Sequence, residues 1–403
     1  MTNTTLEKWE EKMLVELCNI EIGKTPSRSN INFWDKTRST NNTWLSIADL
    51  NNTQNKKVFS SKEQISDLAT QYMKLVKEGT LLLSFKLTIG RVAFAGKDLY
   101  TNEAIAQLPI KNEQKIDKHY LYYYLQYFDY EKLLKGDVKV KGKTLNKEKL
   151  KGLPVCYPPL PEQERIVAKL DKAFEAIDKV KASAEQNLNN AKELFESYLT
   201  SILVNKKDWE KKKLSEVAID FGRGRSRHRP RNDKKLYGGK YPFIQTGDIR
   251  NCNHFITEYS QTYNEFGLAQ SKLWPKGTLC ITIAANIAET GVLTFDSCFP
   301  DSVIGCVFDN SKTNIDYVEY LLQSFKAVLQ AEGKGSAQDN INLGTFEGQY
   351  FPFPDKPTQD NIVIKLDAMR KNIAELEAIY TQKIKECDEL KQSILQKAFR
   401  GEL

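Results

Sequence analysis

The stretch PLPEQERIVAKLD, residues 159–171, decides how this chain is organised. Its prolines close the preceding segment, and from Glu162 to about Leu203 the chain has no glycine and no proline. Such a run predicts one helix of about 42 residues, roughly 60 Å long. The end of the stretch, IVAKLD (166–171), recurs as IVIKLD (362–367). The chain therefore contains a second helix of the same kind, which points to a repeat.

The repeat extends over the whole chain of 403 residues. Its other matches are WEEKMLVELC from Trp9 with WEKKKLSEVA from Trp209, WLSIADL (44–50) with FIQTGDI (243–249), GTLLLS (79–84) with GTLCIT (277–282), and YLYYYLQYF (120–128) with YVEYLLQSF (317–325). From the first match to the last, the offset falls only from 200 to 196. Five matches in order predict a duplicated unit of about 200 residues.

Each copy begins with a mixed region that we expect to fold as an α/β lobe. Short β-branched and aromatic runs, such as 81–96 and 278–295, predict strands of a substantial sheet. Proline-marked boundaries at 157–163 and 351–359 then precede the helices. The predicted organisation is a first lobe (1–157), a helical spacer (158–206), a second lobe (207–353) and a second helical spacer (354–403).

Apolar residues recur along both helices at alternating steps of three and four, which is typical of a coiled-coil seam. The predicted seam residues are Ile166, Leu170, Ile177, Leu194, Tyr198, Ile362, Leu366, Ile373, Leu390 and Ile394. The simplest pairing is antiparallel, between the two copies, with Asn187 and Lys383 near the middle as polar residues that set register. The alternative is that each helix packs independently on its own lobe.

Composition narrows the class of protein. The net charge of +7 favours a polyanionic partner, and the absence of a run of about 18 apolar residues argues against a membrane span. Seven cysteines without a CxxC pair suggest reduced thiols and a cytoplasmic location, and the three histidines lack metal-ligand spacing. No nucleotide loop, nucleophile motif or nuclease motif is recognisable. We expect no catalytic site, no metal and no cofactor in this chain.

The stretch GRGRSRHRPR (222–231) places arginine at every second residue, at Arg223, Arg225, Arg227, Arg229 and Arg231. A basic linker, an address signal and a phosphate-gripping strand or loop are all compatible with this composition. The stretch lies inside the second lobe, in the slot that IGKTPSRSN (22–30) occupies in the first. This placement favours the strand or loop that grips phosphates, because alternate residues of an extended chain share one face.

Other candidate residues for contact with a polyanion such as a nucleic acid lie in both lobes. They are Lys24, Thr25, Ser27, Arg28, Lys86, Arg91, Lys139, Lys141 and Lys143 in the first lobe, and Gln338 and Asn340 in the second. The basic residues suit phosphates, which position a protein without specifying sequence. The two amides can read adenine edges, although an asparagine in a glycine-rich loop also suits turn formation. For each lysine, plain solvation is the competing interpretation.

The plan resembles the specificity subunit (HsdS) of type I restriction-modification systems over essentially the whole chain. The resemblance lies in PLPEQERIVAKLD, in TPSR and WLSIADL of the first lobe, in YGGKYPFIQTGDI (237–249) and in the closing KAFRGEL (397–403). The second copy departs from it with KPTQDN, and the midpoint ILVNKKD (202–208) lacks the closing motif.

The resemblance implies a non-catalytic subunit that binds double-stranded DNA, each lobe being a target recognition domain for one half of a bipartite sequence. The helices would set the gap and dock two methyltransferase subunits, which hold S-adenosylmethionine and methylate adenine; restriction subunits can join them. A coiled-coil scaffold whose lobes bind protein, and an RNA-binding module, are the competing functions.

Overall fold

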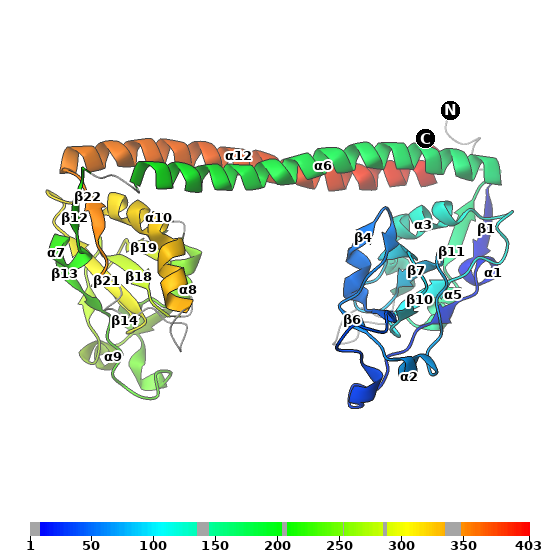
Figure 1. Ribbon diagram of the computed structural model, residues 1–403, viewed down its shortest axis with the longest axis horizontal. Coiled ribbons are helices and arrows are strands. Elements are labelled where there is room, and N and C mark those ends of the chain that lie inside the picture. The colour runs from blue at the N-terminus through cyan, green and yellow to red at the C-terminus, as the bar shows by residue number, and fades with distance from the viewer. Residues whose placement is uncertain (1–8, 135–144, 204–207, 253, 285–287, 335–347) are drawn as a thin grey trace. The chain divides into compact units, whose positions relative to one another are not determined.

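The computed structural model describes residues 9–134, 145–203, 208–252, 254–284, 288–334 and 348–403. The chain divides into two compact units, Met1–Ala184 with Gln382–Leu403, and Glu185–Thr381 (Figure 1). Each unit contains one lobe, the first part of the long helix that follows it, and the last part of the other long helix.

Three sheets form the first lobe. The largest has the order β2 (Glu21–Ile22), β10 (Ile105–Leu108), β7 (Leu81–Ser84), β8 (Val92–Ala95), β5 (Lys57–Val58) and β4 (Thr53–Gln54). A small sheet has the order β6 (Glu63–Gln64), β3 (Thr43–Leu45) and β9 (Tyr100–Thr101), and β1 (Glu10–Met13) pairs with β11 (Pro154–Tyr157). The expected α/β lobe with a substantial sheet is confirmed.

The second lobe repeats this arrangement. Its largest sheet has the order β13 (Ala218–Arg223), β21 (Val303–Phe308), β18 (Leu279–Thr282), β19 (Thr290–Leu293) and β15 (Phe255–Ile256). Its small sheet has the order β16 (Gln261–Tyr263), β14 (Tyr237–Phe243), β20 (Ser297–Cys298) and β17 (Leu273–Trp274), and β12 (Glu210–Lys212) pairs with β22 (Phe351–Phe353). The duplication seen in the sequence is therefore a duplication of topology.

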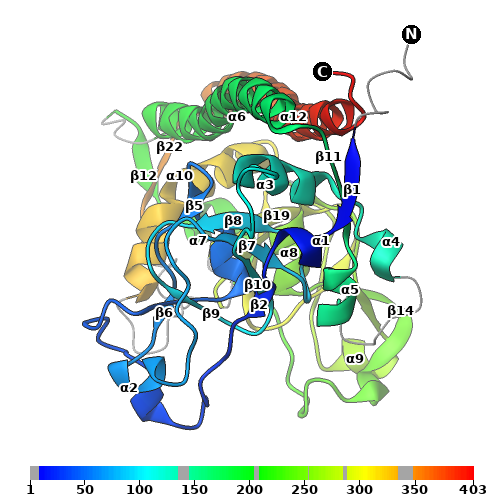
Figure 2. The same ribbon diagram turned by 90° about the vertical axis from the view of Figure 1, so that its right-hand side faces the viewer.

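The central strands are buried on both faces, which explains their unbroken apolar sequences. Every residue of β7, β8 and β18 is buried. One face of the first large sheet packs against the helix α3 (Lys118–Tyr127), which lies between that sheet and the long helices (Figure 2). In the second lobe α10 (Ile315–Lys334) packs in the same way. Strands covered on both faces need no polar alternation.

Short helices lie between the strands of each lobe. They are α1 (Leu14–Leu17), α2 (Asp67–Thr70), α4 (Glu131–Leu134) and α5 (Lys147–Lys151) in the first lobe, and α7 (Leu214–Val217), α8 (Thr246–Asn251) and α9 (Glu265–Ala269) in the second. Single turns of 3-10 helix occur at Ile31–Phe33, Ile47–Asn51 and Lys234–Leu236. The long helices are α6 (Leu160–Leu203) and α12 (Lys356–Phe399), of 44 residues each.

The quoted stretch PLPEQERIVAKLD attaches α6 to the first lobe. Gln163 is buried; its Oε1 accepts from the backbone N–H of Asp117 (2.8 Å), and its Nε2 donates to the carbonyl of Lys115 (2.9 Å) and of Pro158 (2.8 Å). Two turns on, the hydroxyl of Tyr123 on α3 donates to Asp171 (2.5 Å). Because Asp117 also caps α3, the start of α6 and the start of α3 hold each other in place.

The second copy makes the same attachment despite its different sequence. Gln359 accepts from the backbone N–H of Asn314 (2.9 Å) and donates to the carbonyl of Pro354 (2.8 Å). The hydroxyl of Tyr320 donates to Asp367 (2.6 Å), as Tyr123 does to Asp171. Despite the departure from the PLPEQ motif, the second copy therefore keeps two of the three hydrogen bonds of Gln163 and the bond from tyrosine to aspartate.

The two long helices run antiparallel within each unit. In the first unit Lys391 of α12 binds Asp178 of α6 (2.5 Å), and Arg165 near the start of α6 donates to the carbonyl of Leu403 (2.8 Å). Each helix begins on its own lobe and ends on the other copy's lobe. Leu203 packs into the core of the second lobe and Phe399 into that of the first. Independent packing of each helix on its own lobe is therefore wrong.

Most predicted seam residues are buried or partly buried, but two are not. Ile166, Leu170, Ile177, Ile362, Leu366 and Ile373 are buried, and Tyr198 and Ile394 are partly buried. Leu194 and Leu390, which occupy matched positions, are 51% and 50% exposed, so their assignment to the seam is wrong. A straight helix drifts by about 20° per heptad from a strict seven-residue pattern. Towards the helix ends, burial accordingly moves to Leu199 and Leu395.

One contact between the helices, an aromatic ring beside a cation, occurs in both units. The two matched positions that form it exchange the ring and the cation between the copies. In the first unit the ammonium of Lys391 on α12 lies 5.2 Å from the ring centroid of Phe174 on α6. In the second unit the guanidinium of Arg370 on α12 lies 5.8 Å from the ring centroid of Phe195 on α6. At the offset of 196, Phe174 matches Arg370 and Phe195 matches Lys391. The aromatic ring is on α6 in both units and the cation is on α12.

Candidate nucleic-acid interface

The arginine-rich stretch continues the edge strand of the second large sheet. β13 ends at Arg223, paired with β21, and the N–H of Gly224 still donates to the carbonyl of Val303 (2.8 Å). From there exposed Arg223, Arg225 and Arg227 alternate with buried Gly224 and Ser226. A Cβ on residue 224 would lie 2.2 Å from the carbonyl oxygen of Phe299, so only glycine fits this close approach. The predicted shared face is present at these three arginines.

Three of the five guanidinium groups are engaged within the lobe. Arg231 binds both carboxylate oxygens of Asp301 (2.7 and 2.9 Å), and Arg223 donates to the carbonyl of the same residue (2.7 Å). Arg229 donates to the carbonyls of Ser226 (2.6 Å) and His228 (2.9 Å). Within the described part of the chain, the exposed side chains of Arg225 and Arg227 have no such acceptor. These two arginines are the ones available to a ligand.

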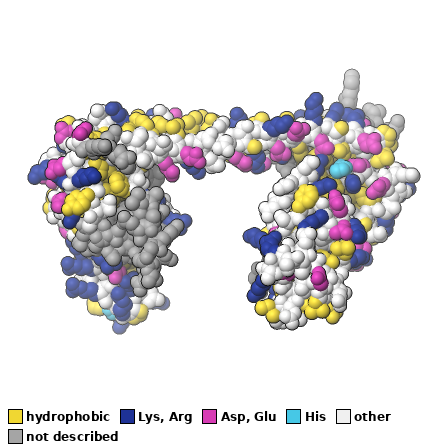
Figure 3. Space-filling model, in the orientation of Figure 1, with side chains coloured by type: hydrophobic (Ala, Val, Ile, Leu, Met, Phe, Trp, Pro, Cys, Tyr) yellow, Lys and Arg dark blue, Asp and Glu magenta, His cyan; other side chains and the backbone are white. Residues whose placement is uncertain are grey.

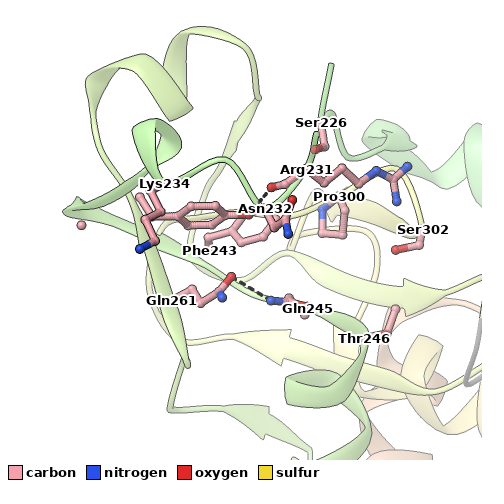
Figure 4. A pocket seen from close by; sticks show the side chains of 12 residues that line it. Ser226, Arg231, Asn232, Lys234, Phe243, Gln245, Thr246, Gln261, Pro300 and Ser302 are labelled. Atoms are coloured by element: carbon pink, nitrogen blue, oxygen red, sulfur yellow. Dashed lines mark hydrogen bonds between the residues drawn. The ribbon is translucent and has the colours of Figure 1, made fainter. Parts of the chain in front are cut away.

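A pocket of about 750 Å³ opens beside the stretch (Figure 4). Its lining includes Ser226, Arg231, Asn232, Lys234, Gln245 and Gln261. The side chains of Gln245 and Gln261 point toward each other, and Nε2 of Gln245 donates to Oε1 of Gln261 (2.8 Å). The lining therefore combines basic and amide side chains with the apolar surfaces of Tyr237, Phe243 and Pro300.

The first lobe has a pocket of about 570 Å³ on its own small sheet, lined by Arg28, Trp34, Glu63 and Gln64 among others. The guanidinium of Arg28 binds both carboxylate oxygens of Glu63 (2.5 and 2.9 Å) and lies 3.8 Å from the ring centroid of Trp34. The hydrogen bond to Glu63 raises the pKa of Arg28 further above its usual range. Arg28 is thus held in place, whereas Lys24 is exposed.

The remaining predicted residues of the first lobe are dispersed. Thr25 bonds through its hydroxyl to Glu103, and Ser27 to the hydroxyl of Ser29 (2.8 Å). Arg91 donates to the carbonyl of Ile47 (3.3 Å), and Lys86 is partly buried beside Phe85. Lys139, Lys141, Lys143, Gln338 and Asn340 lie outside the described residues. The structure therefore brings Lys24, Thr25, Ser27 and Arg28 into one segment without gathering the whole predicted set.

Figure 3 shows Lys and Arg side chains gathered at the end of the second lobe that carries α9. Exposed Arg225 and Arg227 lie near α9, since their backbones bond to Ser271 and Gln270 just after it, and exposed Lys234 lies in the 3-10 turn that contacts α9. In the described ranges no three histidine, cysteine or acidic side chains form a group that could hold a metal ion. No helix among them is long and apolar enough to span a bilayer. Charge and amide groups are thus the chemistry that this surface offers.

His254 belongs to a partly buried ion-pair cluster rather than to this surface. Its Nδ1 is bonded to Glu319, which is almost fully buried, and its Nε2 lies 3.2 Å from Asp316. Burial alone would lower the pKa of His254, but the hydrogen bonds and charges of Asp316 and Glu319 outweigh it and raise the pKa to about 9. The cluster attaches α10 to the segment before β15.

Sequence reasoning missed Gln245, Gln261 and Asp301. Gln245 stood in the quoted match FIQTGDI, in the short link between a strand and a helix, which is where binding residues often lie. Nothing local indicates that Gln261 faces it, because the pairing of β14 with β16 brings them together. The role of Asp301, 70 residues beyond Arg231, likewise depends on the fold.

Comparison with known proteins gives a consistent family. A family model described as the type I restriction modification DNA specificity domain matches residues 6–189 and again residues 206–386. The chain is similar to the type I restriction enzyme MjaIX specificity subunit of Methanocaldococcus jannaschii, with 22% identity over 98% of this chain and 93% of the relative. A putative MjaX specificity subunit of the same organism is 23% identical over 70% of this chain and 68% of its own length.

Two solved structures share the fold. The first, from work on complex assembly and conformational transition of the type I restriction-modification system, has a TM-score of 0.75, with 18% identity and 98% of each chain covered. The second is the HsdS subunit of Thermoanaerobacter tengcongensis, with a TM-score of 0.54, 18% identity, and 98% of this chain and 97% of that chain covered.

Proposed function

Since the chain belongs to the family of type I restriction-modification DNA specificity domains and carries two of them, we propose that each lobe reads one half of a bipartite DNA target. In this role the chain recognises DNA and performs no reaction itself. Half-sites on one face of B-DNA lie about one turn apart, roughly 34–36 Å centre to centre. The paired helices α6 and α12 would hold the lobes at such a spacing.

The observation that carries the proposal is the exposed arginine face of the second lobe. Arg225 and Arg227 extend from the end of an edge strand, without acceptors in the described part of the chain, beside a pocket lined with amides. Arginines supply sequence-independent attraction to phosphates, and amides can read base edges. Together they suit a duplex better than they suit a protein partner.

The same role requires methyltransferase partners, which would hold S-adenosylmethionine, and places the subunit in the cytoplasm. We assign their docking to matched apolar residues that stay exposed on the long helices, Val180 with Leu376 and Leu194 with Leu390. Exposed leucines and valines along a helix suit a partner helix or groove. Because both copies present them, two identical methyltransferases can each find an equivalent surface. Restriction subunits would join that assembly.

Mapping methylated adenines in the host genome tests the proposal most directly. We expect one split motif with a fixed gap that disappears when this gene is deleted and returns when it is restored. The purified chain with its methyltransferase should protect the same duplex from nuclease digestion. A genome whose methylation is unchanged by the deletion would show that the chain has another function.

Lobe exchange then tests the division of labour. Replacing residues 207–350 by the corresponding lobe of a relative should alter one half of the motif and leave the other half and the gap unchanged. A change in both halves would contradict the assignment of one half-site to each lobe. Shortening α6 and α12 by seven residues each should change the gap or abolish assembly, because the helices set the spacing.

A further inference from the structure

We propose that Gln245 and Gln261 form a base-reading pair in the second lobe, and that their base is an adenine read from the major groove. The inference rests on the proposed function, since it names a base contact within the DNA site. It assigns sequence discrimination to two residues, whereas Arg225 and Arg227 supply attraction to the backbone.

The scaffold holds the two amides in fixed positions. Gln261 opens β16 directly opposite Phe243, the last residue of β14, and Phe243 stacks on Tyr263 with ring centroids 4.1 Å apart. Gln245 follows two residues later, where its backbone N–H donates to Asp248 (2.8 Å). Both side chains are exposed at the pocket, although Gln261 belongs to β16 and Gln245 is the N-cap residue of α8. A reading pair needs such support, because loosely held amides discriminate poorly.

The hydrogen bond between the amides sets which groups remain for a ligand. Nε2 of Gln245 donates to Oε1 of Gln261, which leaves Oε1 of Gln245 as an acceptor and Nε2 of Gln261 as a donor. Reversing both amides exchanges the residues but still leaves one donor and one acceptor. In the major groove adenine presents the complement on a single base, the N7 acceptor and the N6 donor.

Two basic residues line the pocket, Arg231 and Lys234, and they differ in what they offer a base. Guanine presents two acceptors in the major groove, and arginine is its commonest reader. Arg231 lines the pocket, but its guanidinium is bound to both carboxylate oxygens of Asp301 (2.7 and 2.9 Å). Lys234 is exposed and supplies donors only, which also suits a phosphate. The amide pair combines a donor with an acceptor, and this combination matches adenine.

The first lobe has different chemistry at the matched positions. Ser46 corresponds to Gln245, and Glu63, opposite Trp44 in the ladder, corresponds to Gln261. Glu63 is occupied by Arg28 through two hydrogen bonds of 2.5 and 2.9 Å. The first lobe thus lacks the amide pair, and we expect the discrimination to appear in one half-site only.

The test uses the complete complex with its methyltransferase and the target mapped for the wild type. Each adenine of that target is replaced in turn by 7-deazaadenine, which lacks the N7 acceptor, and affinity is measured. For the wild type we expect one position in the second lobe's half-site to weaken binding about tenfold. Gln261→Leu should weaken binding to the unmodified duplex by a similar factor and become insensitive to the analogue at that position. Gln245→Leu should also weaken binding to the unmodified duplex. Its binding should no longer change when the N6 amino group of that adenine is removed.

Asn310→Leu, which removes an exposed amide of the same lobe outside the pocket, is the matched control and should keep the wild-type response. Equal sensitivity to the analogues in wild type and both glutamine variants would overturn the pair. Altered discrimination at a guanine would overturn the adenine assignment. A wild-type complex that selects no split target would remove the proposed function, and the pair with it.

Discussion

The ammonium of Lys181 on α6 lies 2.6 and 2.8 Å from the two carboxylate oxygens of Asp388 on α12. At the offset of 196, Lys181 matches Glu377 on α12, and Asp388 matches Lys192 on α6. Each of the two positions therefore carries the opposite charge in the other copy. The helix pair is therefore complementary only when α6 meets α12.

A double-mutant cycle on this pair measures that complementarity. Lys181→Asp and Asp388→Lys should each lower the free energy of unfolding by about 0.5–1 kcal/mol, because each places like charges in contact. The exchange of both residues should recover most of that loss. Urea denaturation at low and high salt provides the measurement, with the coupling weaker at high salt. Strictly additive effects would show that the two charges do not interact.

The five arginines of 222–231 should differ in their effect on DNA binding. Replacing Arg225 and Arg227 by alanine should lower the slope of log affinity against log salt by about two, at roughly 0.9 per phosphate contact. Arg229→Ala is the internal control, because its guanidinium is bonded to the carbonyls of Ser226 and His228. Fluorescence anisotropy across a salt series separates the two results. A slope equal to that of the wild type in the double variant would contradict the assignment.

The His254 cluster should make stability fall at alkaline pH. The pKa of His254 is raised from its ordinary 6.5 to about 9 in the folded chain. Its protonated form therefore contributes fully below about pH 6.5, and the contribution is lost as pH rises through 9. His254→Gln should destabilise the chain by roughly 3 kcal/mol at pH 7, since it leaves buried Glu319 unpaired. Denaturant midpoints from pH 6 to 10 should then fall less steeply in the variant than in the wild type.

Near the end of α12, Phe399 is buried in the core and Leu390 is half exposed, so their contributions to stability should differ. Phe399 packs against Tyr120, Tyr124 and Tyr127, with ring centroids 5.0–5.4 Å apart. Phe399→Ala should cost about 3–5 kcal/mol, because it empties space in the first lobe's core. Leu390→Ala, in the same helix but half exposed, should change stability by less than about 0.5 kcal/mol. Calorimetry of both variants checks the contrast, and equal losses would return Leu390 to the seam.

The parts of this fold that could be predicted depend on local pattern and on repetition. The run without glycine or proline predicted both long helices, and the matched segments predicted two lobes of one topology. The heptad pattern failed at Leu194 and Leu390, because a small angular drift accumulates along a helix. The last turns of each long helix also pack on a lobe rather than only on the other helix. The pocket escaped prediction because Gln245 and Gln261 meet only through the pairing of β14 with β16. Likewise, only the fold shows that Asp301 engages Arg223 and Arg231.

The exchanged contact of Phe174 with Lys391, and of Phe195 with Arg370, bears on the history of the chain. Two copies of the first half would bring two phenylalanines together there, and two copies of the second half would oppose an arginine and a lysine. A duplicated ancestor must have been able to pair with itself, since its halves were identical. The two helices have since diverged, so that at these positions α6 fits α12 better than it would fit a second α6. The duplication has thus become mutual dependence, in which neither half can be lost or doubled without damage to the pair.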